Sequence, residues 1–297
     1  MTEPRRAPPL PLGGDDGLPY SRGLMARALM ATGVPAMRAY ELALRVQSDL
    51  NDRGQQAVDL DRLEELARDV LGEGEGTQAM RRLRRYEALR HLDLPLILLV
   101  GGATGTGKST VATEVAYRLG ITRVTSTDFV RQTMRACLTH DFMPSIHYSS
   151  FKVPVEHEFA GDVVGGFLEQ SRNVLIGIRA VIERALEEGW SVVLEGVHLV
   201  PGMLPPVEGA LVVHCLLAIE EEAMHEAHFW VRDASSDGVR PVEKYLEALP
   251  AIRQIQEFLV SQARLCNVPV VENGNIELSI GTVMELVLSG AERLVRV

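Results

Sequence analysis

The sequence predicts an α/β protein: a parallel sheet with helices on both faces, joined to a small N-terminal helical domain. After residue 94, short apolar runs bounded by turn residues alternate with amphipathic helical patterns, as in proteins built on parallel sheets. Between residues 19 and 90, apolar residues instead recur every three or four positions, which indicates helices alone. We therefore expect a disordered, Pro/Gly-rich tail over residues 1–18, a helical domain over 19–90 and an α/β domain over 91–297.

The net charge of −10 lies entirely after residue 90, because residues 1–90 hold equal numbers of arginines and acids. An acidic domain argues against nucleic acid as a partner, since that binding needs a basic face. No apolar run approaches the ~20 residues of a membrane span, and the N-terminus lacks an apolar signal core, so no membrane partner is expected. Three cysteines without metal or redox spacing are typical of free thiols in a cytoplasmic protein. Whether the protein forms a homo-oligomer stays open.

Three helices are expected in the N-terminal part, over residues 19–33, 35–50 and 59–72, because each spaces its apolar residues by three and four. Gly33 is suited to end the first helix and Pro35 to open the second. A fourth helical stretch carries an arginine cluster, which either contacts nucleotide phosphates or forms a solvated helix face. The cluster consists of Arg81, Arg82, Arg84 and Arg85.

Five short apolar runs bounded by turn residues are expected as the strands of the sheet. They cover residues 96–100, 123–126, 191–194, 210–219 and 268–271. Because ligands of parallel sheets bind at the carboxyl ends of the strands, the residues that follow each strand are the candidates for function.

The first strand leads into a phosphate-binding loop. Residues 102–109 read G-A-T-G-T-G-K-S and match the Walker A pattern G-x-x-x-x-G-K-[ST] at every fixed position. The glycines let the backbone curl so that its N–H groups and the following helix dipole face phosphate oxygens. Lys108 is expected to reach the outer phosphates, and the Ser109 hydroxyl to bind Mg²⁺. The alternative is a plain turn between strand and helix.

This loop makes the predicted sheet a P-loop NTPase-type sheet, with ATP and Mg²⁺ as cofactors. The expected nucleotide-binding residues are Gly102, Ala103, Thr104, Gly105, Thr106, Gly107, Lys108, Ser109 and Thr110.

The second strand is followed by Asp128 at the start of a helix. Asp128 either accepts a proton from a substrate hydroxyl, holds Mg²⁺ through water, or caps that helix. One turn apart on the same helix, Arg131 and Arg135 either bind an acceptor carboxylate or phosphate, or form a solvated basic face.

The third strand ends in Glu195, which suits the Walker B position and would orient Mg²⁺; the alternative is an ordinary strand-end acid. His198 is a candidate substrate contact, although a lone histidine is usually structural. The polar stretch 139–158 is expected to form part of an acceptor pocket, or else a surface loop. Its candidate residues are Tyr148, Ser149, Ser150 and Lys152.

The fourth strand is followed by a helix with His225, His228 and Arg232, and then by a Ser/Gly segment that reaches Arg240. The two histidines lack a third ligand at a spacing typical of metal sites. Arg232 and Arg240 either belong to a lid that closes over a transferring phosphoryl group, or lie in an exposed loop.

From about residue 18 onward the chain resembles the 2-phosphoglycerate kinases, which make 2,3-bisphosphoglycerate from ATP and 2-phosphoglycerate. The resemblance includes PYSRGLMARAL, the loop after LILLVGG, TSTDFVRQTMR, HYSSFK, VVLEGVH, KYLEALPAIRQIQEFLV and NVPVVEN. It implies an ATP-dependent kinase whose substrate is a small phosphorylated acid. Residues 19–71 also resemble an ATP-cone, but the basic strand that opens that module is replaced here by the Pro-rich tail, so no second nucleotide site is assigned.

Three alternative functions stay open at this point. A kinase for another anionic metabolite would share every motif above. An ATP-sensing regulator would bind or hydrolyse ATP without an acceptor. A polynucleotide kinase is disfavoured by the net charge of −10.

Overall fold

The computed structural model describes residues 20–90, 92–154, 162–235 and 242–295. The predicted disordered tail, residues 1–18, lies outside the described residues. The chain divides into two compact units, each with its own core. None of the helices in the described ranges has the length and apolar character that a membrane crossing requires.

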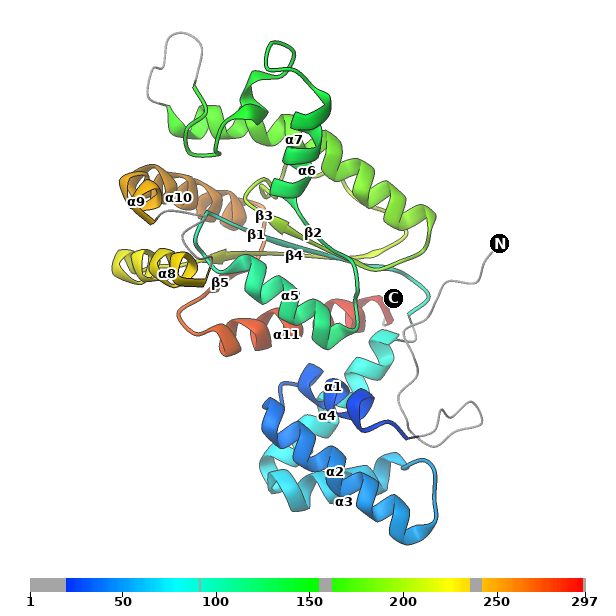
Figure 1. Ribbon diagram of the computed structural model, residues 1–297. Helices are drawn as coiled ribbons and strands as arrows, with labels where there is room; N and C mark the ends of the chain where they lie inside the picture. The colour runs from blue at the N-terminus through cyan, green and yellow to red at the C-terminus, as the bar shows by residue number, and fades with distance from the viewer. Residues whose placement is uncertain (1–19, 91, 155–161, 236–241, 296–297) are drawn as a thin grey trace. The chain divides into compact units, whose positions relative to one another are not determined.

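The first unit contains four helices near the N-terminus, shown in blue to cyan in Figure 1. They are α1 (Arg22–Ala31), α2 (Ala36–Arg53), α3 (Leu60–Leu71) and α4 (Glu73–Arg90). Pro35 precedes α2 as its N-cap, and Gly33 has a φ of +85°, so both residues act as the sequence predicts. The apolar positions spaced by three and four are buried between the helices; they include Met25, Leu29, Leu42, Val46, Leu63 and Leu66.

A buried charge pair joins α2 to α3. Asp49 is only 6% exposed and accepts hydrogen bonds from Arg62 at 2.5 Å and 3.2 Å. These bonds lower the pKa of Asp49 below its ordinary 3.8, against the opposing effect of burial. Because a buried carboxylate without its partner is costly, the pair fixes how the two helices pack.

The arginine cluster of α4 bonds to protein groups of the same unit. Arg82 donates to the carbonyl of Thr32 at 3.1 Å, and Arg84 pairs with Glu64 at 2.8 Å. Arg85 pairs with Glu285 at 2.7 Å. These three guanidinium groups are therefore bound to protein groups rather than only to solvent, and their predicted contact with nucleotide phosphates stays a prediction.

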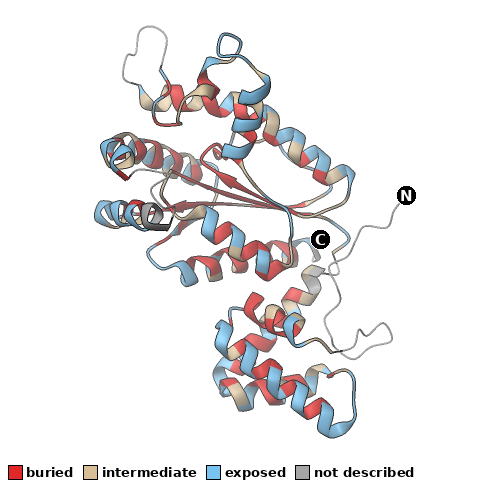
Figure 2. Cartoon of the chain, viewed as in Figure 1, coloured by how far each residue is buried: buried red, intermediate tan, exposed pale blue. Residues whose placement is uncertain are grey.

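The second unit is built on a five-stranded parallel sheet of order β2-β3-β1-β4-β5. The strands are β1 (Leu96–Gly102), β2 (Val124–Ser126), β3 (Val192–Gly196), β4 (Leu211–Ala218) and β5 (Val270–Glu272). Their bounds differ from the predicted ones by at most two residues. The central strand β1 is buried along its whole length, as Figure 2 shows for most of the sheet.

Helices cover both faces of this sheet, as predicted (Figure 1). They are α5 (Lys108–Leu119), α6 (Thr127–Cys137), the short 3-10 helix η1 (Pro144–His147), α7 (Val163–Glu187), α8 (Glu222–Ser235), α9 (Val242–Glu247), α10 (Leu249–Leu265) and α11 (Ile276–Val295). Among the described residues, two apolar clusters lie between the sheet and the helices α7 and α10. One packs α7 against β1 and β3, and the other packs α10 around Phe167 and Leu216. The predicted fold class is confirmed.

The amino ends of β2 and β3 are joined by an aromatic contact. Arg123 stacks over the ring of Trp190 with its central carbon 3.7 Å from the ring centroid, and Arg184 approaches the same ring at 5.9 Å. Such cation–π contacts hold the two chain segments together at the edge of the sheet opposite to its carboxyl ends.

Candidate active site at the carboxyl edge of the sheet

The phosphate loop leaves the centre of the sheet between β1 and α5. Gly102, Gly105 and Gly107 have φ values of +150°, +88° and +79°, which L side chains rarely adopt. A Cβ on Gly102 would lie 2.6 Å from the carbonyl oxygen of Leu217 on β4. The motif glycines are therefore required by both the curl of the loop and the closeness of the neighbouring strand.

The polar residues of the loop are ordered by contacts at its two ends. The Lys108 ammonium donates to the carbonyl of Ala103 at 3.0 Å, which folds the side chain back over the loop. The Ser109 hydroxyl donates to Oε1 of Glu195 at 3.0 Å. This second contact follows from the sheet order, because β1 and β3 are neighbours and Val100 is in register with Glu195.

The Ser109–Glu195 pair has the chemistry of a magnesium site. Glu195 is 7% exposed, and its second oxygen Oε2 is buried without a hydrogen-bond partner among the described residues. A hydroxyl and a carboxylate are hard oxygen ligands of the kind that Mg²⁺ prefers, with the remaining positions left to water and phosphate. No cluster of three or more His, Cys, Asp or Glu side chains suited to a metal occurs in the described ranges.

Asp128 lies in the first turn of α6, which follows β2 at the same edge of the sheet as this pair. The N-cap of α6 is Ser126, whose hydroxyl accepts from the amide of Phe129 at 3.0 Å, so Asp128 is not the helix cap that one interpretation of the sequence allowed. Its side chain is 68% exposed and pairs with Arg131 at 3.3 Å. Desolvation acts to raise the pKa of Asp128. The positive charges of His198 in its protonated form, of Arg131 and of Lys108 outweigh this effect, so the pKa lies below its ordinary 3.8. Asp128 is therefore ionised at neutral pH.

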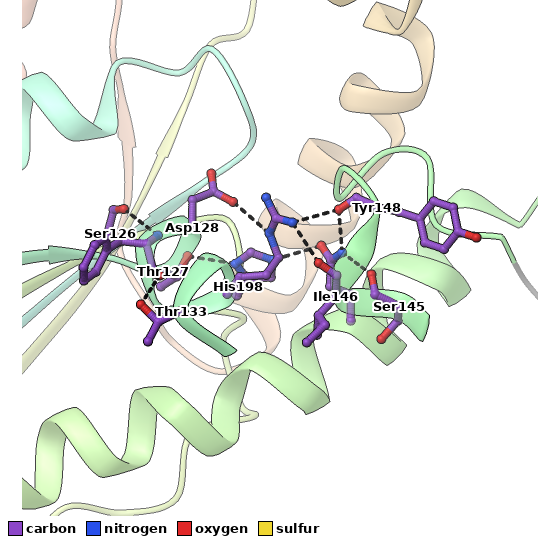
Figure 3. Close-up of polar contacts among 11 residues, drawn as sticks. Ser126, Thr127, Asp128, Thr133, Ser145, Ile146, Tyr148 and His198 are labelled. Carbon is purple, nitrogen blue, oxygen red and sulfur yellow. Dashed lines mark hydrogen bonds and ion pairs between the residues drawn. The ribbon is translucent and has the colours of Figure 1, made fainter. Parts of the chain in front are cut away.

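His198 is an interior residue at 1% exposure, in a hydrogen-bonded network shown in Figure 3. Its Nδ1 lies 2.8 Å from the Thr127 hydroxyl and its Nε2 lies 3.0 Å from Oε1 of Gln170. Burial lowers the pKa of His198 to about 4. With both ring nitrogens bound by protein, His198 has no direction from which to contact a substrate. These contacts favour the structural alternative for His198 over contact with a substrate.

The direction of each hydrogen bond in this network is fixed by Gln170. Its amide nitrogen lies 2.6 Å and 3.1 Å from the carbonyl oxygens of Ser145 and Tyr148, which can only accept. Its amide oxygen must then face His198, so Nε2 of that ring carries the proton and Nδ1 accepts from Thr127. The network thus connects the start of α6 to the η1 segment.

Curated relatives decide the family. The 2-phosphoglycerate kinases of Methanopyrus kandleri and Pyrococcus horikoshii are each 37% identical, over 280 and 276 residues; both alignments cover 92% of this chain, and 84% and 91% of those proteins. That of Thermococcus kodakarensis is 35% identical over 280 residues, or 93% of this chain and 95% of that one. The chain belongs to the 2-phosphoglycerate kinase family. The predicted family is confirmed, and with it the prediction of an ATP-dependent phosphotransferase.

Other comparisons add little to this assignment. No family model matches the chain. Among solved structures, a gluconokinase from Sinorhizobium meliloti aligns over 68% of this chain and 94% of its own, at 16% identity and a TM-score of 0.38. A similarity that low does not by itself establish a shared fold.

The predicted acceptor residues of this 2-phosphoglycerate kinase family member lie on α6 and around η1. Arg131 donates from Nη1 to the carbonyls of Ile146 and Tyr148, at 2.9 Å and 3.1 Å, while its Nη2 has no hydrogen-bond partner among the described residues. Arg135 is exposed one turn further along α6. The Tyr148 hydroxyl lies 3.1 Å from Nε2 of His140.

The remaining predicted residues belong to the segment after η1 and to the predicted lid. Ser149 is partly buried and Lys152 is exposed, both just after η1. Arg232 lies in α8, but its side chain is not among those described. Arg240 falls outside the described residues altogether, so the lid hypothesis stays a prediction.

The outer face of the phosphate loop carries contacts that the sequence patterns did not predict. Three consecutive carbonyl oxygens, those of Thr104, Gly105 and Thr106, are each bound by a side chain from elsewhere in the fold. The three side chains are His225, His228 and Asn273. The only sequence signal was the spacing of the two histidines on one helix, which was weighed as a metal site.

Proposed function

We propose that this protein transfers the γ-phosphoryl group of ATP to the free 3-hydroxyl of 2-phosphoglycerate, giving 2,3-bisphosphoglycerate and ADP. The bond between the γ-phosphorus and its bridging oxygen breaks, a new phosphorus–oxygen bond forms, and the hydroxyl proton is released. The observation that carries the proposal is the Ser109–Glu195 contact beside the phosphate loop, in a chain whose relatives bear the name of this reaction.

The phosphate loop is proposed to hold ATP. Backbone N–H groups from Gly102 to Thr110 would surround the phosphates, and Lys108 would exchange the Ala103 carbonyl for a phosphate oxygen. Ser109 and Glu195 would hold Mg²⁺, which when bound neutralises the charge on the β- and γ-phosphates. Catalysis in this scheme is mainly positioning and charge neutralisation.

Asp128 is proposed as the group that receives or orients the acceptor hydroxyl. It follows β2, whose last residue Ser126 is in register with Glu195, so it lies at the same edge of the sheet as the metal ligands. An ionised carboxylate can accept a proton or hold a metal-bound water. Its lowered pKa keeps it in the form that either role requires.

The acceptor is proposed to bind beside α6 and η1. A phosphorylated acid carries a phosphate and a carboxylate, and Arg131 keeps the Nη2 edge of its guanidinium for such a group. Arg135, Tyr148, Ser149 and Lys152 would complete this side of the pocket. Arg232 and Arg240 would close over the transferring group when both substrates are bound.

The test is ADP release with Mg-ATP alone and with 2-phosphoglycerate, 3-phosphoglycerate or glycerate added, with the product identified by phosphorus NMR. We expect strong stimulation by 2-phosphoglycerate alone and a bisphosphorylated product. Lys108→Ala serves as the control and should abolish turnover while the protein stays folded. Stimulation by a different acid would replace the acceptor. ADP release without stimulation by any acid would instead favour an ATP-dependent switch.

A further inference from the structure

The side chains that bind the outer face of the phosphate loop form a set we call the carbonyl clasp: His225, His228 and Asn273. His225 Nε2 lies 2.8 Å from the carbonyl oxygen of Thr104, and His228 Nδ1 lies 3.0 Å from that of Gly105. Asn273, which follows β5, donates from its side-chain amide to the carbonyl of Thr106 at 2.9 Å. Two distant parts of the chain thus bind three successive peptide groups.

The proton positions in the clasp follow from its acceptors. A backbone carbonyl can only accept, so each facing nitrogen must carry hydrogen. Burial lowers the pKa of His225, and its neutral ring therefore carries its one proton on Nε2. The Nδ1 of that ring is buried without a hydrogen-bond partner among the described residues. The single N–H donor of His225 is therefore bound to the Thr104 carbonyl of the loop.

The contacts of the clasp also fix the direction of the N–H groups on the inner face of the loop. In a trans peptide the carbonyl oxygen and the following N–H point in opposite directions. Binding of the Thr104, Gly105 and Thr106 oxygens by the clasp therefore turns the N–H groups of the next residues, up to Gly107, away from the clasp. Of these, the Thr106 N–H makes a long contact with the Ala103 carbonyl, at 3.4 Å, within the loop. Those are the N–H groups that a phosphate loop presents to its ligand.

The clasp is itself held by aromatic packing. The His225 ring stacks on Phe229 at 5.3 Å between centroids and 16°, and Phe229 stacks on Tyr245 of α9 at 5.3 Å and 11°. His225 is wholly buried and Phe229 nearly so. A Cβ on Gly105 would lie 2.5 Å from the Phe229 ring, so α8 packs directly against the loop. The donor of His225 is therefore held in place by packing.

We propose that His225, His228 and Asn273 are positioning residues for ATP, which hold the phosphate loop in its anion-binding conformation before the nucleotide arrives. None of the three belongs to the Walker A pattern. When a loop is already ordered by the rest of the protein, the nucleotide does not have to order it on binding. The binding free energy is then not reduced by the cost of ordering the loop. The inference rests on the proposed role of the loop in binding ATP.

His228 offers the cleanest test, because it is only partly buried. His228→Leu removes the donor and replaces the ring with an apolar side chain of similar size. His228→Asn keeps a nitrogen donor near the position of Nδ1. The probe is Mg-ADP, titrated calorimetrically into the full chain, followed by steady-state kinetics. We expect His228→Leu to weaken Mg-ADP binding about tenfold, the fold-change that corresponds to one lost hydrogen bond.

The same variant should leave the KM of the acid acceptor unchanged within about twofold, since the hydrogen bond removed is to the phosphate loop alone. His228→Asn should bind Mg-ADP nearly as well as the wild type. Glu226→Gln, an exposed change on the same helix, is the matched control. His225→Leu and His225→Gln form a second pair, in which glutamine keeps a donor near the position of Nε2.

Equal Mg-ADP affinity in the wild type and both leucine variants would overturn the inference. So would asparagine and glutamine variants as weak as the leucine ones, because the effect would then lie in packing rather than in the donors. A wild type that fails to bind Mg-ADP would refute both this inference and the proposed function. A wild type that binds it but phosphorylates no acid would refute only the proposed reaction.

Discussion

Gln170 allows the role of the buried network to be tested apart from the phosphate loop. This side chain joins His198 to the carbonyls of Ser145 and Tyr148, and so ties α7 to the start of η1. Gln170→Leu keeps the approximate volume and removes all three hydrogen bonds. We expect lower stability together with weaker binding of the acceptor.

The expected loss in the free energy of unfolding depends on which polar groups lose their last hydrogen-bond partner. The Tyr148 carbonyl keeps its bond from Arg131 at 3.1 Å, and the Ser145 carbonyl keeps a weak one from the Tyr148 amide at 3.4 Å. Only the Nε2–H of His198 is left without any acceptor that the structure shows. One buried unsatisfied group costs about 1–3 kcal/mol, and the weakened carbonyls add to it, so a loss of about 2–4 kcal/mol is expected. For a unit of this size, at about 2–4 °C per kcal/mol, that corresponds to a Tm lower by about 4–16 °C.

The assay is thermal unfolding followed by circular dichroism, with steady-state kinetics on the same preparations. The acceptor KM should rise in Gln170→Leu while the KM for ATP stays near the wild-type value, because η1 lies on the proposed acceptor side. Glu169→Ala, an exposed neighbour on α7, should change the free energy of unfolding by less than about 0.5 kcal/mol. A Gln170→Leu protein with wild-type Tm, or with both KM values raised equally, would refute this reasoning.

Three further predictions concern the carboxylates of Glu195, Asp128 and Asp49. Glu195→Gln should lower activity about 10–100-fold and shift half-saturation to higher Mg²⁺, measured by magnesium titration of turnover; an unchanged titration would remove Glu195 from the metal site. Asp128→Asn should lower kcat about 10²–10⁴-fold in single-turnover assays if Asp128 receives the proton, and near-normal turnover would exclude that role. The stability supplied by Asp49, whose pKa is lowered by Arg62, is present above its ordinary 3.8 and lost as the pH falls through the lower folded value. Asp49→Asn should therefore flatten the acid dependence of unfolding of the helical unit, and an unaltered dependence would contradict the assignment.

The secondary structure was predictable because its signals are local. Strands of a parallel sheet are buried on both faces, so each appears as a short continuous apolar run such as residues 96–100. The α/β architecture, the strand bounds and the phosphate loop all follow from patterns within about ten residues of each other in the sequence.

The site contacts were less predictable because they join residues far apart in the sequence. Thr127 and His198 are separated by 71 positions, and Thr104 and His225 by 121. A histidine that follows a strand has the same local pattern whether it faces a substrate or the interior, so the sequence left both interpretations of His198 open. Nothing in the spacing of His225 and His228 indicates that their partners are loop carbonyls rather than a metal.

The placement of the two tryptophans gives this protein a built-in optical probe. Trp190 lies under Arg123 at the amino ends of the strands, away from the phosphate loop, and its emission should not respond to nucleotide. Trp230 is 55% exposed on α8, the helix that carries the two histidines of the clasp. A Trp190→Phe protein would then report through one fluorophore whether α8 changes its surroundings when nucleotide binds, without any attached label.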